Sequence, residues 1–228
     1  MTTRAASGSS GRWAARAGSE SRRVALGWAL LGLLAAAAAA CAPPPPPASP
    51  ETAARAAAVR SYNSQIKVSL SGEQGRGRLR VLLAFRRPDG LRIEVPGPTG
   101  ARLIAVAQGD ALWAVFPGDR AAFLGRTNAE DMEALLGVAL SPREMMDLLV
   151  GAQVGGLSDH RVRWGPSLPR EVRATLSDRS RLKVVVEAAE AEVALAEAAF
   201  QPPPHEGYRT VDAGEARELL VGRRRKRP

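Results

Sequence analysis

Apolar and polar residues alternate along three stretches in the first half of the chain. In 66–70, 79–85 and 91–95, every second residue is Leu, Val, Ile or Phe, and most residues between them are polar. A period of two is typical of a β-strand with one buried face. Turn-forming residues follow the first two stretches, at Ser71-Gly72 and at Pro88-Asp89-Gly90. The pattern predicts antiparallel hairpins with one apolar face and one arginine-rich face.

The same signals predict more strands on either side of a helical segment. Strands are expected at 101–108, 111–117, 120–125, 159–164, 171–176 and 182–187. In the middle, Asn128 can cap a helix that ends at Gly137, and Ser141-Pro142-Arg143-Glu144 is a capping box that opens a second helix. Short helices are also expected at 50–60 and 212–221. The order of elements predicts an α+β fold that is mainly β.

One segment, 187–200, gives conflicting signals. Its sequence EAAEAEVALAEAAF favours a helix by composition. It directly follows a predicted strand, however, and three prolines come soon after it. We expect a strand that ends in a loop.

The first forty residues have the parts of an export signal. Five arginines precede residue 24, and residues 24–40 carry no charge. A basic region followed by an apolar run and small residues is typical of a signal peptide. The alternative is a transmembrane helix. Such a helix needs about 20 apolar residues, and this run is slightly shorter than that.

The single cysteine, Cys41, follows the apolar run directly. Ala38-Ala39-Ala40-Cys41 resembles the bacterial lipoprotein box, in which the cysteine is acylated and becomes the first residue of the mature protein. The proline run behind it predicts an extended spacer. A lipid anchor is therefore expected, with a plain secretory signal or an uncleaved anchor as alternatives. The pair Arg22-Arg23 leaves both general and twin-arginine export open.

The positive charge of the chain is concentrated at its two ends. The formal net charge is +9, but five arginines against one glutamate precede Cys41, and residues 223–227 are all basic. The body is close to neutral, so no nucleic acid is expected as a partner. Two histidines and one cysteine cannot form a common structural zinc site. The sequence has no Gly-x-Ser-x-Gly elbow, phosphate loop or dinucleotide fingerprint, so neither catalysis nor a cofactor is expected.

Three segments, in this order, resemble the LolA/LolB lipoprotein-carrier superfamily. They are RRPDGLRIEVPGPTGARLIAV at 86–106, LLGVALSPREMMDLLVG at 135–151 and AAFQPPPHEGYRTV at 198–211. Because a lipid anchor is expected, the resemblance is closest to the membrane-anchored branch, LolB, or to related lipoproteins of unknown role. It implies a strongly curved antiparallel sheet that forms an incomplete barrel, covered by short helices, with an apolar cavity for acyl chains.

The resemblance also implies which residues meet the acyl chains. The cavity lining is expected to be Leu79, Val81, Leu83, Phe85, Leu91, Ile93, Leu103, Trp113, Met132, Met145 and Leu149. Ordinary packing in the core is the alternative for the apolar strand residues and the methionines. The loop Pro96-Gly97-Pro98-Thr99-Gly100 corresponds to the loop with which the receptor transfers cargo to the membrane. Thr99 stands where the receptor has an exposed leucine, so either delivery differs here or the protein has another lipid-binding role.

Four regions are expected: a signal peptide at 1–40, the lipidated Cys41 with its linker at 41–49, a half-barrel domain at 50–212, and a short helix with a basic disordered tail at 213–228. The expected partners are acylated lipoproteins or other lipids, the outer membrane through the anchor, and a soluble periplasmic carrier. A monomer facing the periplasm is expected. The alternatives are a structural or assembly lipoprotein that binds protein partners, and a glycolipid or phospholipid carrier.

The predicted lipid anchor can be tested by replacing the Cys41 sulfur. Cys41→Ser removes the thiol that would receive the lipid, so metabolic labelling with a radiolabelled fatty acid should disappear and uncut precursor should accumulate. Labelling that persists in this variant would contradict the assignment of Cys41.

Overall fold

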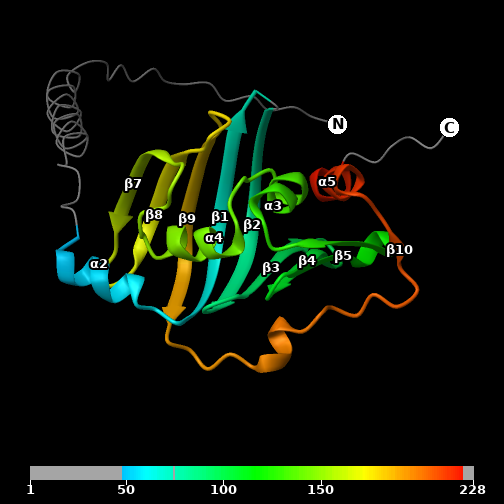
Figure 1. Ribbon diagram of the computed structural model, residues 1–228, viewed down its shortest axis with the longest axis horizontal. Coiled ribbons are helices and arrows are strands. Elements are labelled where there is room, and N and C mark those ends of the chain that lie inside the picture. The colour runs from blue at the N-terminus through cyan, green and yellow to red at the C-terminus, as the bar shows by residue number, and fades with distance from the viewer. Residues whose placement is uncertain (1–47, 74, 223–228) are drawn as a thin grey trace, which may run out of the picture. The chain divides into compact units, whose positions relative to one another are not determined.

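The computed structural model describes residues 48–73 and 75–222. The predicted signal peptide, Cys41, the linker up to residue 47 and the basic tail 223–228 lie outside these residues. Within them, ten strands form one sheet in the order β10-β6-β5-β4-β3-β2-β1-β9-β8-β7 (Figure 1). The strands are β1 (Ser61–Gly72), β2 (Gly75–Arg86), β3 (Gly90–Gly97), β4 (Gly100–Gln108), β5 (Ala111–Phe116), β6 (Ala121–Arg126), β7 (Ser158–Trp164), β8 (Pro169–Thr175), β9 (Arg181–Ala191) and β10 (Arg209–Thr210).

The sheet is antiparallel except at one edge. Only β10 runs parallel to its neighbour, β6, through a two-residue pairing. The two edge strands, β7 and β10, are not paired with each other, so the sheet stays open as an incomplete barrel. The predicted fold class is therefore confirmed: a mainly β α+β fold with a curved, open antiparallel sheet and short helices.

Four α-helices lie in the described part of the chain: α2 (Pro50–Ala57), α3 (Ala129–Leu136), α4 (Pro142–Leu149) and α5 (Ala213–Val221). The connection from β6 to β7 carries α3 and α4 across one face of the sheet, so that β9 returns to pair with β1 (Figure 1). The capping box at α4 forms as predicted. The Ser141 hydroxyl accepts a hydrogen bond from the Glu144 N–H at 3.3 Å, and the Glu144 carboxylate accepts one from the Ser141 N–H at 2.8 Å.

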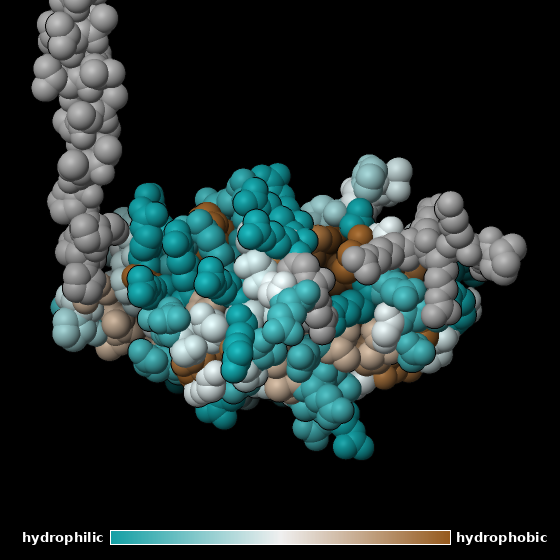
Figure 2. Space-filling model, turned by 90° about the horizontal axis from the view of Figure 1, so that it is seen from above, coloured by the Kyte–Doolittle hydropathy of each residue, from teal (hydrophilic) through white to brown (hydrophobic). Residues whose placement is uncertain are grey.

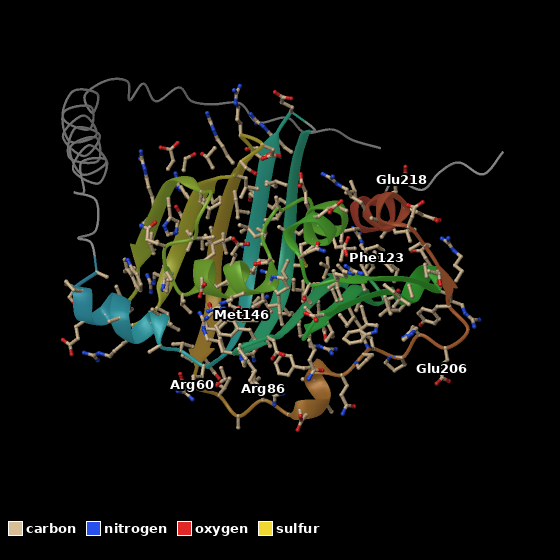
Figure 3. All side chains as sticks on the ribbon, in the orientation of Figure 1. Arg60, Arg86, Phe123, Met146, Glu206 and Glu218 are labelled. Carbon is tan, nitrogen blue, oxygen red and sulfur yellow. The ribbon has the colours of Figure 1, made fainter. Side chains whose placement is uncertain are left out.

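The main core lies between α3, α4 and the face of the sheet that they cover. The strand register places Leu83 beside Ile93, and both side chains are buried. From α4, Met146 is completely buried (labelled in Figure 3). The Tyr62 and Phe85 rings stack with their centroids 5.0 Å apart. Removing these apolar side chains from water, at about 25 cal/mol per Å², is the main force that holds the helices on the sheet.

The outer face of the sheet is polar over β7, β8, β9 and β1. Glu171 of β8 accepts a hydrogen bond from Arg173 Nε at 2.6 Å, and the Lys183 Nζ lies 3.2 Å from its carboxylate. Burial acts to raise the pKa of Glu171, but these two cations outweigh it, and the pKa is lowered. The carboxylate therefore stays ionised and compensates the positive charge of this face.

The segment after β9 covers the outer face of the other half of the sheet. The 3₁₀-helix η2 (Glu197–Phe200) packs there, with Phe200 completely buried. The Arg86 guanidinium lies 5.1 Å from the centre of the Phe200 ring (Arg86 is labelled in Figure 3), and Arg92 Nη1 donates to the Ala199 carbonyl oxygen at 2.9 Å. η2 therefore covers part of the outer face of the sheet, opposite the larger cover that α3 and α4 form on the inner face.

The ambiguous segment 187–200 is resolved in two parts. The strand predicted there continues only to Ala191. At Glu192 the backbone has a φ of 55°, and the Glu192 carboxylate accepts a hydrogen bond from the Arg60 N–H at 2.8 Å. The strand therefore ends at this turn and a loop follows it, as predicted, and Glu197–Phe200 form η2 within that loop.

The two faces of β2 can be compared by mutation. Phe85→Ala should lower the free energy of unfolding by about 3–5 kcal/mol, because it removes a completely buried ring and leaves a cavity. The matched control is Leu82→Ala, which truncates a side chain that is 41% exposed on the opposite face and should cost below about 1 kcal/mol. Urea unfolding of the two variants measures both values. Equal losses would contradict the assignment of the faces.

Candidate functional site

The candidate site begins where β2 extends beyond its neighbour. Along its whole length β2 pairs with β1, from Gly75 to Arg86. Its pairing with β3 covers only Leu82–Arg86. A register shift between Val95 and Pro96 interrupts β3 just beyond this pairing. One edge of β2 from Gly75 to Val81 is therefore not paired with β3, and the sheet opens there.

A groove of about 430 Å³ lies at this opening. It lies between the free half of β2, the adjoining part of β1, the end of α3, and α5. Its apolar lining consists of Val68, Leu70, Leu79, Leu136, Val138, Leu220 and Val221. Val221 is among the large apolar residues that are most exposed, at 58%. Hydrophobic surface is visible among hydrophilic side chains in the view from above (Figure 2).

Gly77 is the reason that the groove is open along β2. It lies on the same face as Leu79 and is paired with Leu70 of β1. A Cβ atom built on Gly77 would have no heavy atom within 4 Å. Gly72, at the end of β1, shows the opposite, because its Cβ would lie 2.2 Å from Ser180 Oγ. The missing side chain at Gly77 thus leaves space between apolar residues, whereas Gly72 permits close packing.

α5 is positioned to form one wall of the groove. The Asp212 carboxylate caps its start by accepting a hydrogen bond from the Glu215 N–H at 2.8 Å. Ala216 and Leu220 are buried on the inner side of the helix. At the other end, Arg102 of β4 donates from Nη1 to the Leu220 carbonyl oxygen at 3.2 Å. The helix predicted at 212–221 therefore exists, and long-range contacts hold it beside the sheet.

The residues predicted to line a cavity fall into three groups. Leu79 lines the groove. Trp113 is half-buried and lies at a different hollow, beside Leu124 near the β6 edge. The remaining residues pack in the core between sheet and helices: Val81, Leu83, Phe85, Leu91, Ile93, Leu103, Met132 and Leu149 are buried, and Met145 is partly buried against them.

The predicted transfer loop, Pro96 to Gly100, forms the tip of the β3–β4 hairpin. Pro98, Thr99 and Gly100 are exposed. The tip borders a second hollow of about 660 Å³, together with Gly118 and the end of α5. Arg102 contributes to this hollow and to the groove, so the two are adjacent.

Sequence reasoning missed most of the groove lining, which comes from β1, α3 and α5. One local signal was available at Gly77, because a glycine inside an alternating strand marks a missing side chain or a close approach. The contribution of Leu220 and Val221 had no such signal. It depends on where α5 docks.

The perturbed titratable groups lie outside the groove lining. Burial raises the pKa of the Tyr62 hydroxyl, against a smaller opposite effect of the nearby Ser64 hydroxyl. Burial lowers the pKa of His160. Among residues 48–73 and 75–222, no three histidine, cysteine or carboxylate side chains come together as metal ligands. No helix in this part of the chain is long and apolar enough to span a bilayer.

Comparison with known proteins gives matches only at the level of structure. No family model matches the sequence, and no curated protein matches it. A domain described as an outer membrane lipoprotein-sorting protein domain, from Vibrio parahaemolyticus, is similar with a TM-score of 0.38 and 9% identity over 66% of this chain and 93% of that one. An uncharacterized conserved protein from Thermus thermophilus has a TM-score of 0.42 and 10% identity, over 71% and 96% of the two chains.

A LolA superfamily protein from Nitrosomonas europaea has a TM-score of 0.39 and 8% identity, over 66% of this chain and 96% of that chain. TM-scores and identities this low assign no function to this chain. The functional case therefore depends on its own groove.

Proposed function

We propose that this protein binds acyl chains in the groove between β2, α3 and α5. In this proposal it is held at the cell envelope by a lipid on Cys41 and helps to receive or localise lipoproteins at the outer membrane. A soluble periplasmic carrier would supply the cargo. The protein would act as a monomer and as a binding protein without catalysis.

The observation that carries the proposal is an apolar groove that remains open beside a well-packed core. Its volume of about 430 Å³ falls within the range of roughly 300–1,000 Å³ that is common for small-molecule sites. Val68, Leu70, Leu79 and Leu136 are partly exposed in it, so an acyl chain placed there would shield apolar surface. Each methylene removed from water stabilises binding by about 0.8 kcal/mol.

A second candidate function has one specific observation in its favour. The centre of the fold, where the family resemblance places a cavity, is filled by buried side chains such as Val81, Leu83 and Phe85. A filled interior is what a structural or assembly lipoprotein would have. Such a protein would use the groove and the adjacent hairpin tip to hold a protein partner.

A larger side chain on β2, placed inside the groove, distinguishes acyl binding from the second function. Gly77→Leu places a side chain in open space, so the fold should tolerate it. If the new side chain displaces two to three methylenes of the ligand, the Kd of a fluorescent fatty-acid probe should rise by roughly 10- to 60-fold. Fluorescence titration of the purified protein measures the change.

Gly155→Leu is the matched control. Gly155 also has no heavy atom within 4 Å of an added Cβ, but it lies in a turn outside the groove. This variant should bind the probe like the wild type. Absence of probe binding by the wild-type protein, together with a stable co-purifying envelope complex, would refute acyl binding and favour the second function.

A further inference from the structure

Three rows of directly opposed residues cross five neighbouring strands on the outer face of the sheet, from β2 through β1, β9 and β8 to β7 (Figure 1). The rows are Arg78, Ser69, Lys183, Arg173 and Arg161; Arg80, Lys67, Val185, Glu171 and Arg163; and Arg76, Ser71, Arg181, Thr175 and Ser158. We call the residues of these rows the basic face. Most of them are Arg or Lys, and Glu171 is the only carboxylate among them.

The first row places like charges directly opposite one another. Arg161 pairs with Arg173, and Arg173 pairs with Lys183. Like charges at such positions of adjacent antiparallel strands destabilise a sheet. Glu171 offsets part of this repulsion, because its carboxylate lies 2.6 Å from Arg173 Nε and 3.2 Å from Lys183 Nζ. An arrangement that works against folding stability in this way points to a use outside folding.

Three arginines of the basic face have no anionic partner within residues 48–73 and 75–222. Arg76, Arg161 and Arg181 form no ion pair there, and all three are exposed. Arg80, in contrast, lies 2.9 Å from Glu187. The three unpaired guanidinium groups come from three different strands, and each presents its N–H donors to the surroundings of the protein.

The positive charge of this face is segregated within a body whose net charge is close to zero. Part of the compensating negative charge lies on α3, which covers the inner face and carries Glu130, Asp131 and Glu133. Such a separation of charge produces a local field, which attracts an anionic surface and orients the molecule toward it.

The composition of the basic face favours lipid headgroups over a protein partner. The centre of a protein interface is typically apolar, rich in aromatic residues and poor in charge. The basic face has no aromatic residue, and Val185 is its only large apolar residue. An anionic bilayer needs no apolar contact, because it attracts each Lys or Arg near its surface. A guanidinium can also bind a lipid phosphate with two parallel hydrogen bonds.

We infer that the basic face is the surface with which the folded domain lies on an anionic lipid bilayer. This inference goes beyond the proposed acyl binding and does not depend on it. The groove residues Gly77 and Leu79 alternate with Arg76, Arg78 and Arg80 along β2 and lie on the other face of the sheet.

Labelling of arginines with phenylglyoxal, followed by mass spectrometry of peptides, tests this orientation in the full-length chain. The chain is mixed with vesicles of phosphatidylcholine alone, or with vesicles in which a third of the lipid is phosphatidylglycerol. On the anionic vesicles, labelling of Arg76, Arg161 and Arg181 should slow by about fivefold, the effect expected of one cation near an anionic surface. Added salt should restore the labelling, since it screens exposed charges.

The same experiment contains an internal control. Arg120, Arg126 and Arg143 are also exposed and form no ion pair with a described carboxylate, but they lie outside the basic face. Their labelling should be equal on both kinds of vesicle. This control separates an oriented domain from a chain that is only held near the vesicle by its ends.

A triple variant removes the unpaired cations of the face. Arg76→Gln, Arg161→Gln and Arg181→Gln together leave every ion pair of the described residues in place, so the fold should tolerate them. Arg78, which remains on the face, should then be labelled at the same rate on neutral and anionic vesicles.

The matched triple variant carries Arg120→Gln, Arg126→Gln and Arg143→Gln. It removes the same charge from the chain and keeps the basic face intact. Arg78 should therefore remain protected on the anionic vesicles in this variant.

Several outcomes would overturn the inference. They are equal labelling of the basic face on both kinds of vesicle, equal slowing of the control arginines, and protection of Arg78 that survives in the first triple variant. Protection on isolated cell envelopes but not on phosphatidylglycerol vesicles would assign the face to an acidic protein partner, and this result would also overturn it.

Discussion

The unequal pairing of β2 with its two neighbours is the constraint on which the candidate site depends. β1 accompanies β2 over twelve residues, whereas β3 leaves it beyond the pair Leu82 and Glu94. A strand edge that is released inside a sheet must be covered or must open to solvent. Here α5 and the end of α3 approach the opening without closing it, because Gly77 contributes no side chain. The groove is thus a consequence of register and of one missing side chain.

Away from this opening, the apolar parts of the sheet are largely covered. The inner face of the sheet is filled by buried side chains of the strands and of α3 and α4, and η2 packs against β3 and β4 on the outer face. Among the large apolar residues of the described chain, Val221 at this opening, Leu124 of β6 and Leu82 of β2 are the exposed ones. A binding protein needs such a stable frame around the site, since a ligand must release without unfolding its carrier.

Local patterns predicted most of the elements because their causes are local. Alternation predicted the strands, and side-chain caps predicted α3 and α4, since an Asn or Ser at the first position satisfies free backbone N–H groups. The end of the strand in segment 187–200 has a non-local cause, because the chain turns at Glu192, whose carboxylate accepts a hydrogen bond from the Arg60 N–H. The predicted cavity residues share one face of the sheet and its helices, except Trp113, which pairs with Val106 on the opposite face. Whether a residue on that face meets a ligand or another side chain depends on how deep the helices pack.

Three properties can be derived from the sequence alone: the alternation that makes antiparallel strands, the caps that start the helices, and the distribution of charge between the ends and the body. These properties follow from neighbours within a few residues. Tertiary packing places Leu79, Leu136 and Leu220 in one groove and leaves Val81, Leu83 and Phe85 in the core. This arrangement depends on where β3 leaves β2 and where α5 docks. Distant contacts, including the bond from Arg102 to the Leu220 carbonyl oxygen, fix these positions.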